Sequence, residues 1–239
     1  MSTPGGQPNT IRVFSGGAPQ RPLSHLAPAF EKMSGVNAQI DYEIVSQLQD
    51  RVTGGDHPDL ILAPAQVILG IGETVPLLPE GSVTLASVGI GVILGTGASM
   101  PDVSSEDALR SALRRARAIV LADPRTPTGK HLARVFERLG IAGELQDRLV
   151  HKGAIHGGGD FVATGRADIG LFLVSEVQFI DGVTVAGLLP PALQQDIVYT
   201  TGIPRSAPAP EVALAFIGFL TGPDSAPHWI AGGFKPASA

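Results

Sequence analysis

Residues 119–136 read IVLADPRTPTGKHLARVF, and this stretch decides the fold. It opens with a short apolar run, which is the pattern of a buried strand. A loop follows, and apolar residues then return with the three- and four-residue spacing of one helix face, at Leu132, Val135, Phe136 and Leu139. Thr126 or Thr128 can cap that helix, and Pro127 suits its first turn. The stretch therefore predicts a buried strand, a tight loop and the start of a helix.

The start of such a helix is a favourable place for an anion. Its first backbone N–H groups have no partner inside the helix, and the helix dipole is positive there. Similar strand–loop–helix patterns occur after Gly17, near Ser46 and near Gly157. Each pattern is also that of an ordinary connection that binds nothing, so the residues alone leave both interpretations open.

The composition bounds the class of protein. The chain has 239 residues, of which 44% are hydrophobic and 16% charged, as in a globular protein with a sizeable core. The net charge is −5 and no basic patch stands out, so we expect no nucleic-acid partner. There is no Cys, and the six His lack the spacing of metal ligands. We therefore expect no metal and no cofactor.

The first residues, MSTPGGQPNTIRVF, lack the basic and apolar regions of a signal peptide. On this evidence the chain as given is expected in the cytoplasm, or in the periplasm if a leader was removed. The longest apolar run, residues 83–95, is shorter than the roughly 20 residues that span a bilayer.

Alternating strand and helix patterns predict an α/β fold with mostly parallel sheets. The long β-rich run at 83–95 suits a strand that leaves one sheet and enters a second, and residues 195–202 suit the return. We therefore predict two lobes with a ligand cleft between them: residues 1–84 with 200–239, and residues 85–199. Residues 152–155 are predicted as a further strand, and residues 211–221 as the final helix.

Several motifs in order along the chain resemble those of type II periplasmic binding proteins, and the molybdate-binding group most of all. The motifs are IRVFSGG at 11–17, HPDLILAPAQ at 57–66, ADPRTPTGKHLARVFERLGI at 122–141, VATGRADIGLFL at 162–173 and the C-terminal FLTGPDSAPHWIAGGFKP. The resemblance implies two α/β lobes joined by two crossovers, which close on a small anion. It also implies a monomer, and an ABC permease as partner if the chain is exported.

The resemblance also implies which residues contact the ligand. Carried over to this chain, together with the helix starts above, they are Ser15, Gly16, Gly17, Ala18, Val45, Ser46, Thr126, Thr128, Gly129, Ile155, His156 and Gly157. The chain departs from the molybdate group where that group has a Tyr hydroxyl, because Leu173 stands there. Ala18 and Val45 likewise fall where the group has Ser, with Ser15 and Ser46 close by. A buried oxyanion oxygen without a donor costs about 1–3 kcal/mol. We therefore expect an organic carboxylate rather than molybdate.

The chain also resembles aconitate isomerase, an enzyme built on the same kind of lobes. Isomerisation of such an acid needs a general base, and His156 beside the glycine run 157–159 is the candidate. The alternative is that His156 only caps a helix at the surface. The sequence leaves open whether the protein is a binding protein or an isomerase of a small tricarboxylic acid.

Overall fold

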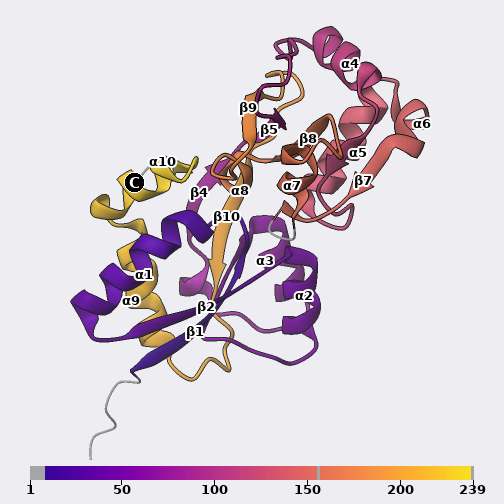
Figure 1. Ribbon diagram of the computed structural model, residues 1–239. Helices are drawn as coiled ribbons and strands as arrows, with labels where there is room; N and C mark the ends of the chain where they lie inside the picture. The colour runs from indigo at the N-terminus through magenta and orange to yellow at the C-terminus, as the bar shows by residue number, and fades with distance from the viewer. Residues whose placement is uncertain (1–8, 155–156, 238–239) are drawn as a thin grey trace, which may run out of the picture. The chain divides into compact units, whose positions relative to one another are not determined.

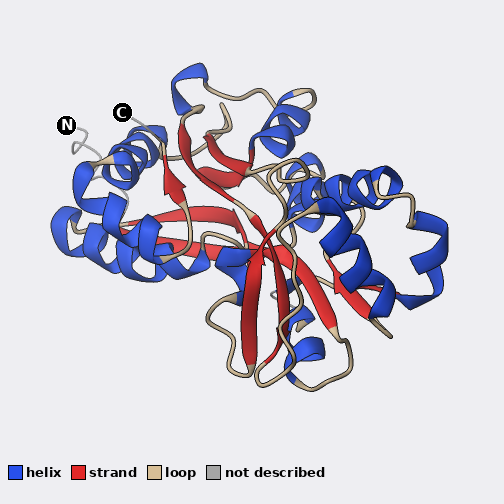
Figure 2. Ribbon diagram, turned by 90° about the horizontal axis from the view of Figure 1, so that it is seen from above, coloured by secondary structure: helices blue, strands red, loops and turns tan. Residues whose placement is uncertain are grey.

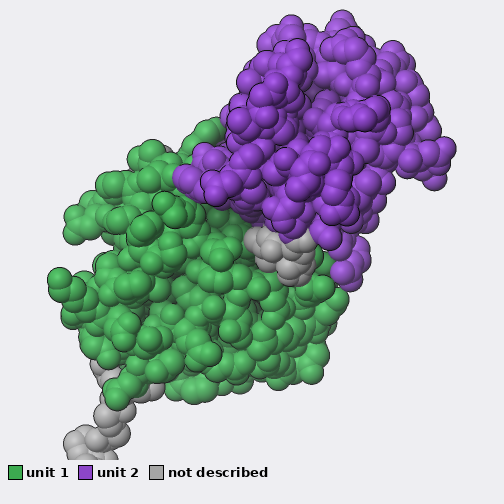
Figure 3. Space-filling model, viewed as in Figure 1, with its two compact units in different colours: residues 1–86, 198–239 green, residues 87–197 purple. Residues whose placement is uncertain are grey.

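The computed structural model describes residues 9–154 and 157–237. The chain forms two compact units, drawn in green and purple in Figure 3. Unit 1 comprises residues 1–86 and 198–239, and unit 2 comprises residues 87–197. The chain therefore passes between the units twice, and the first unit is built from both of its ends.

Figure 1 labels the main elements along the chain, and Figure 2 distinguishes helix, strand and loop. The elements are β1 (Thr10–Gly16), α1 (Gln20–Ser34), β2 (Asn37–Glu43), α2 (Val45–Thr53), β3 (Leu60–Pro64), α3 (Ala65–Gly72), η1 (Pro79–Gly81), β4 (Thr84–Val88), β5 (Ile90–Gly95), α4 (Glu106–Arg115), β6 (Ile119–Leu121), α5 (Pro127–Arg138), α6 (Ala142–Leu145), η2 (Gln146–Arg148), β7 (Leu149–His151), α7 (Gly158–Ala163), β8 (Ile169–Leu173), α8 (Val174–Val177), β9 (Val183–Leu188), β10 (Ile197–Gly202), α9 (Pro210–Thr221), η4 (Pro223–Ser225), α10 (Ala226–Ala231) and β11 (Lys235–Pro236).

Unit 1 is built on a six-stranded sheet in the order β11-β4-β10-β3-β1-β2. β1 pairs in parallel with β2 and with β3, whereas β10 runs antiparallel to β3. Helices α1 and α9 pack together, with the rings of Phe30 and Phe216 4.8 Å apart. A separate apolar cluster joins α2 and α3 to the sheet through Leu48, Ile61 and Ile71, all fully buried. Helices therefore cover this sheet with two apolar clusters, as in other α/β units.

Unit 2 is built on a five-stranded sheet in the order β7-β6-β8-β5-β9. β6 pairs in parallel with β7 and β8, and β5 is antiparallel to both β8 and β9. Val120, Val162 and Phe172 belong to one buried cluster that also includes Ile93 of β5. The buried strands β6 and β8 carry uninterrupted apolar runs, because both of their faces are covered.

The predicted fold class is confirmed: each unit is α/β, and each contains the expected parallel strands. The expectation of mostly parallel sheets was too simple, because β5 and β10 run antiparallel to their neighbours. These two strands are entered directly from the crossovers, so no βαβ connection forces them to be parallel. No helix in the described ranges is long and apolar enough to cross a membrane.

Two local predictions were wrong. The strand expected at residues 152–155 is β7, which ends at His151. The strand begins earlier than expected, because Leu149 and Val150 pair with Ile119 and Val120 of β6. The helix expected to be the last, α9, is followed by α10, where Trp229 is buried and donates a hydrogen bond to the Leu220 carbonyl at 3.0 Å.

Candidate functional site

In unit 1 the predicted ligand residues gather at one edge of the sheet. Because β1 and β2 are parallel and Gly16 is paired with Glu43, the loops that follow both strands begin side by side. Ser15, Gly16, Gly17 and Ala18 follow or end β1, and Val45 and Ser46 begin α2. We call this the carboxyl edge of unit 1. The amino-terminal ends of helices that follow parallel strands meet at such an edge.

The chain comes very close to itself at Gly16. A Cβ atom at this position would lie 2.8 Å from Cγ1 of Val45 and 3.2 Å from the hydroxyl of Tyr199. Gly16 is therefore required because β1, α2 and β10 converge there. Beside it, the buried hydroxyl of Ser15 donates to the Gly16 carbonyl at 2.9 Å, so Ser15 is already engaged locally.

Ser46 is the most informative residue of this edge. Its side chain is buried, and its Oγ makes no hydrogen bond within the described part of the chain. No side chain caps α2, and the amides of Gln47 and Leu48 both donate to the Ile44 carbonyl. The first-turn amides of Val45 and Ser46 have no partner inside the helix. Within the described residues, this helix start therefore has a hydroxyl without a hydrogen bond beside amides that the helix itself does not pair.

In unit 2 a second carboxyl edge forms in the same way. Strands β6, β7 and β8 are parallel neighbours, with Leu121 aligned with both His151 and Leu171. The loops after these three strands therefore leave the sheet together. Thr126, Thr128 and Gly129 follow β6, and Gly157 follows β7. The predicted Ile155 and His156 lie outside the described residues.

The start of α5 shows how the predicted residues divide their roles. Thr126 caps the helix: its Oγ1 accepts from the Gly129 amide at 3.1 Å and donates to the Asp123 carbonyl at 2.7 Å. Pro127 has no N–H group. Thr128 is buried, and its hydroxyl makes no hydrogen bond in the described ranges. Its amide lies in the first turn of the helix, where it has no partner inside the helix. Thr128 is therefore the residue of this loop best able to bind an anion.

Gly157 lies at the start of α7 with a left-handed backbone, at a φ of 86°. Its amide donates to the Ala154 carbonyl at 3.2 Å. The Asp160 carboxylate lies close by, 3.0 Å from where a Cβ of residue 157 would be. The conformation explains why glycine stands here, and the nearby carboxylate makes this loop less favourable to an anion than the start of α5.

Two further polar residues lie at this edge and were not predicted. Ser175 and Gln178 follow β8, and both the Oγ of the buried Ser175 and Nε2 of Gln178 are buried without a partner within the described residues. Residues 44–48 and 173–177 share a pattern, IVSQL and LVSEV, and the backbone leaves the strand in the same way at Ile44 and Leu173, with ψ of 130° at both. That repeated pattern is the signal in the sequence from which Ser175 could have been predicted.

Glu176 is also on this turn. Burial raises the pKa of its carboxyl to about 7, although the side chain is only partly covered. The carboxyl makes no hydrogen bond or ion pair within the described residues. A carboxyl with such a pKa is able to give or take a proton near neutral pH.

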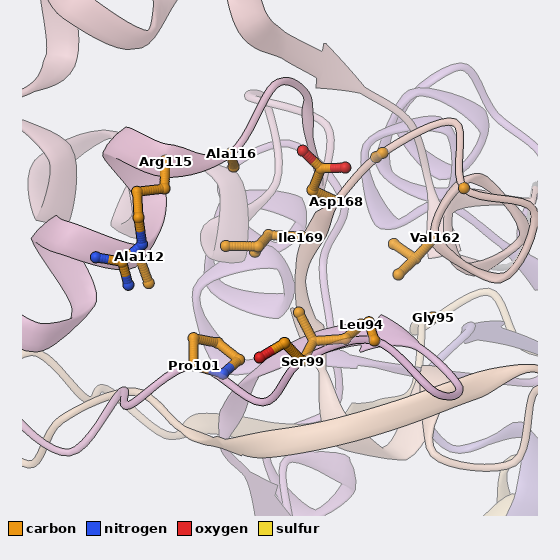
Figure 4. Close-up of a pocket in the computed structure, with 13 residues that line it drawn as sticks. Leu94, Gly95, Ser99, Pro101, Ala112, Arg115, Ala116, Val162, Asp168 and Ile169 are labelled. Carbon is orange, nitrogen blue, oxygen red and sulfur yellow. The ribbon is translucent and has the colours of Figure 1, made fainter.

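A cavity of about 320 Å³ lies elsewhere in unit 2, at the opposite end of β8 (Figure 4). Its lining is mainly apolar, with Leu94, Val162 and Ile169 among the contributors. The Asp168 carboxylate at its wall is held by Arg117, with Nη2 2.6 Å from Oδ1, and this hydrogen bond lowers the pKa of Asp168. None of the residues predicted from the sequence lines this cavity, and we do not assign the anion site to it.

The comparisons with known proteins agree with the fold of the two units. A family model described as bacterial extracellular solute-binding protein matches residues 11–235. The chain belongs to this family. The resemblance inferred from the motifs is thereby confirmed. In the described part of this solute-binding protein, no three His, Asp or Glu side chains are grouped as metal ligands.

Two curated relatives are similar over most of this solute-binding protein. An aconitate isomerase from Pseudomonas sp. is 28% identical over 246 residues, covering 96% of this chain and 89% of the relative. The molybdate-binding protein ModA of Azotobacter vinelandii is 26% identical over 218 residues, which cover 84% of this chain and 80% of that relative. The solved structure of the A. vinelandii periplasmic molybdate-binding protein superposes with a TM-score of 0.79 at 19% identity, over 95% of this chain and all of that one. At that identity the structural likeness establishes the fold.

Proposed function

We propose that this solute-binding protein binds a small organic carboxylate, and that the carboxyl edge of each unit carries groups able to bind it. The observation that carries the proposal is the pair of buried hydroxyls that have no partner among the described residues, Ser46 in unit 1 and Ser175 in unit 2. A buried polar group without a partner costs about 1–3 kcal/mol, so it is normally retained for a ligand or an ordered water. Both hydroxyls lie at helix starts after parallel strands, where anions are favoured.

A carboxylate fits this edge better than a tetrahedral oxyanion does. Leu173 ends β8 with an apolar, buried side chain where the molybdate-binding group supplies a Tyr hydroxyl. Ser15 and Thr126 use their hydroxyls in bonds to the local backbone. The donors that remain are Ser46, Thr128, Ser175 and first-turn amides. A compact oxyanion needs donors for all of its oxygens converging on one point, and the loss of the Tyr, Ser15 and Thr126 hydroxyls removes several of them.

The experiment is a thermal-shift panel with molybdate, tungstate, sulfate, phosphate, citrate, cis-aconitate and trans-aconitate. A ligand present at 100 times its dissociation constant stabilises the folded state by about 2.7 kcal/mol. We expect a clear rise in melting temperature with at least one of the organic acids and none with molybdate. A rise with molybdate or tungstate and none with any organic acid would reject the carboxylate proposal.

A second candidate function is isomerisation of a small tricarboxylic acid. It is favoured by the 28% identity to an aconitate isomerase over 96% of the chain, and by the carboxyl of Glu176 with a pKa of about 7 at the edge of unit 2. Isomerisation removes a proton from one carbon and returns it at another, which a group of that pKa can do. The predicted base His156 is the other candidate.

Proton NMR of cis-aconitate incubated with the protein tests this second function directly. Formation of the trans isomer at a rate proportional to protein concentration supports it. If Glu176→Gln abolishes turnover and His156→Ala does not, Glu176 is the acid–base group. Binding of aconitate without conversion restricts the protein to binding, and an ABC permease is then the partner that we propose for it.

A further inference from the structure

Unit 2 contains a second polar pocket, of about 360 Å³, on the outer face of α5. His131, Arg134 and Arg138 line one side of it, and their spacing of three and four places them on one face of the helix. Gln194 and Gln195, from the segment between β9 and β10, line the other side. None of the residues proposed above for the anion lines this pocket, and its volume is at the lower end of the range for small-molecule sites.

The hydrogen bonding of His131 leaves one ring nitrogen unused. Its Nε2 is 2.8 Å from the carbonyl oxygen of Leu193. Because a carbonyl oxygen only accepts, Nε2 carries the proton, and in the neutral ring Nδ1 is then an acceptor. Nδ1 is buried and has no partner within the described residues. The pocket wall thus contains a buried acceptor that needs a donor.

Gln194 presents a second acceptor of the same kind. Its Nε2 donates to Oδ1 of Asp196 at 3.2 Å, which fixes the orientation of the amide. Its Oε1 is buried and has no donor within the described ranges. Two acceptors in the lining of this pocket, one on each side, therefore lack donors within the described residues, and each costs free energy unless something fills the pocket.

The pocket is also positively charged. Within the described residues, Arg134 makes one hydrogen bond, from Nη2 to Oε1 of Gln195 at 3.4 Å, and no ion pair with a carboxylate. Arg138 pairs with Glu106 at 2.6 Å. A guanidinium group has five N–H donors in a fork that matches a carboxylate. The pocket therefore offers donors for an anion on α5 beside acceptors for a hydroxyl.

We propose that this pocket is a second ligand site, specific for a small hydroxycarboxylate. Its carboxylate pairs with the guanidinium of Arg134, and its hydroxyl donates to Oε1 of Gln194 or Nδ1 of His131. A sulfate ion or a carboxylate without a hydroxyl satisfies the arginine and leaves both acceptors without donors. The hydroxyl is therefore the feature that the pocket selects.

The test compares citrate with tricarballylate, which has the same three carboxylates and no hydroxyl. Calorimetric titrations use the full chain with Ser46→Ala and Ser175→Ala together, so that the carboxyl edges contribute little. We expect citrate to bind at least tenfold more tightly than tricarballylate. Arg134→Ala and Gln194→Met should each weaken citrate about tenfold, since a charge-assisted or buried hydrogen bond is lost. Arg115→Ala, an exposed arginine elsewhere in unit 2, is the matched control and should change nothing.

The outcomes separate this proposal from the proposed function. Citrate binding that disappears in the double serine variant, or that is unaffected by Arg134→Ala and Gln194→Met, belongs to the carboxyl edges and overturns the second site. Equal affinity for citrate and tricarballylate would contradict the selection of a hydroxyl. No binding of citrate at all would overturn the second site, because the pocket would then hold only water. Citrate binding that survives the serine changes and is lost with Arg134 supports the second site, whatever binds at the edges.

Discussion

Gly129 lies directly against the backbone of Asp123: a Cβ atom at position 129 would be 2.1 Å from the Asp123 carbonyl oxygen. The loop after β6 folds back onto the first turn of α5 at this point. The Thr126 hydroxyl connects the same two segments, because it hydrogen-bonds both the Asp123 carbonyl and the Gly129 amide. The clash involves backbone on both sides, so no flexible side chain can move to relieve it. The position of Thr128, and of the helix start that it belongs to, therefore depends on a glycine at 129.

The first prediction is that Gly129→Ala lowers the free energy of unfolding by about 2 kcal/mol or more, because the loop must shift to admit a methyl group. Urea unfolding measures it. The control is Gly218→Ala, at an exposed position inside α9 with nothing within 4 Å of the added Cβ. That change should be neutral or stabilising by about 0.5–1 kcal/mol, since alanine is the better helix former. Equal effects of the two changes would contradict the packing argument.

Asp59 provides a second prediction, in unit 1. Its buried carboxylate accepts from the Arg12 amide at 2.8 Å and from the Ala209 amide at 3.0 Å, and so joins the start of β3 to β1 and to the beginning of α9. Asp59→Ala leaves two backbone donors without partners. We expect a loss of about 3 kcal/mol in the free energy of unfolding. The exposed Asp147→Ala should stay within about 0.5 kcal/mol of wild type.

The carboxyl of Glu176 predicts a specific pH dependence of stability. Its pKa is raised from 4.5 to about 7 by burial. Below pH 4.5 the group is protonated in both the folded and the unfolded protein and has no effect. As the pH rises toward 7 the unfolded protein loses the proton first, so the folded state is progressively destabilised. Glu176→Gln should therefore leave stability unchanged at pH 4.5 and raise it by about 1–3 kcal/mol at pH 8.

Urea unfolding at several pH values measures this difference between variant and wild type. Glu137→Gln, an exposed change on α5, serves as the control and should change stability by no more than about 0.5 kcal/mol. If the difference for Glu176→Gln is the same at pH 4.5 and pH 8, the carboxyl is not buried in the way described.

Much of the unit 1 edge could be predicted from the sequence, because its signals are local. Ser46 comes soon after an alternating strand and lies in the first turn of a helix of nine residues, long enough to show apolar periodicity. Ser175 has the same neighbours, but α8 is only four residues long and has no periodicity to detect. That its hydroxyl lacks a partner is a property of the packed unit, and no pattern of residues expresses it.

Neither the direction of the strands nor the roles of individual loop residues could be predicted from the sequence. An apolar run such as that of β5 has the same pattern in either direction, and only its pairing with β8 shows that it is antiparallel. Thr126 and Thr128 were equal candidates for the cap. The structure separates them, because Thr126 bonds to both Asp123 and Gly129, whereas the hydroxyl of Thr128 makes no hydrogen bond in the described part of the chain.

The last prediction concerns the two serine hydroxyls: replacing them should not lower the free energy of unfolding, unlike most changes of buried residues. Ser46→Ala or Ser175→Ala removes a buried oxygen that has no partner in the part of the chain that the structure describes. Each variant without ligand should therefore be at least as stable as wild type, by up to about 1 kcal/mol. Each should bind the stabilising carboxylate about tenfold more weakly, since the hydroxyl is used only by the ligand. A purely structural serine would lower stability instead. Ser24→Ala, on the exposed face of α1, is the control.

The central claim is tested most directly by one comparison: the dissociation constant of trans-aconitate, measured by calorimetry, for wild type, Ser46→Ala and Ser175→Ala. The account predicts measurable binding to wild type and a loss of about tenfold in each variant, with unfolding stability kept. Affinities for trans-aconitate that are the same in all three proteins, or tight molybdate binding in place of the carboxylate, would contradict it.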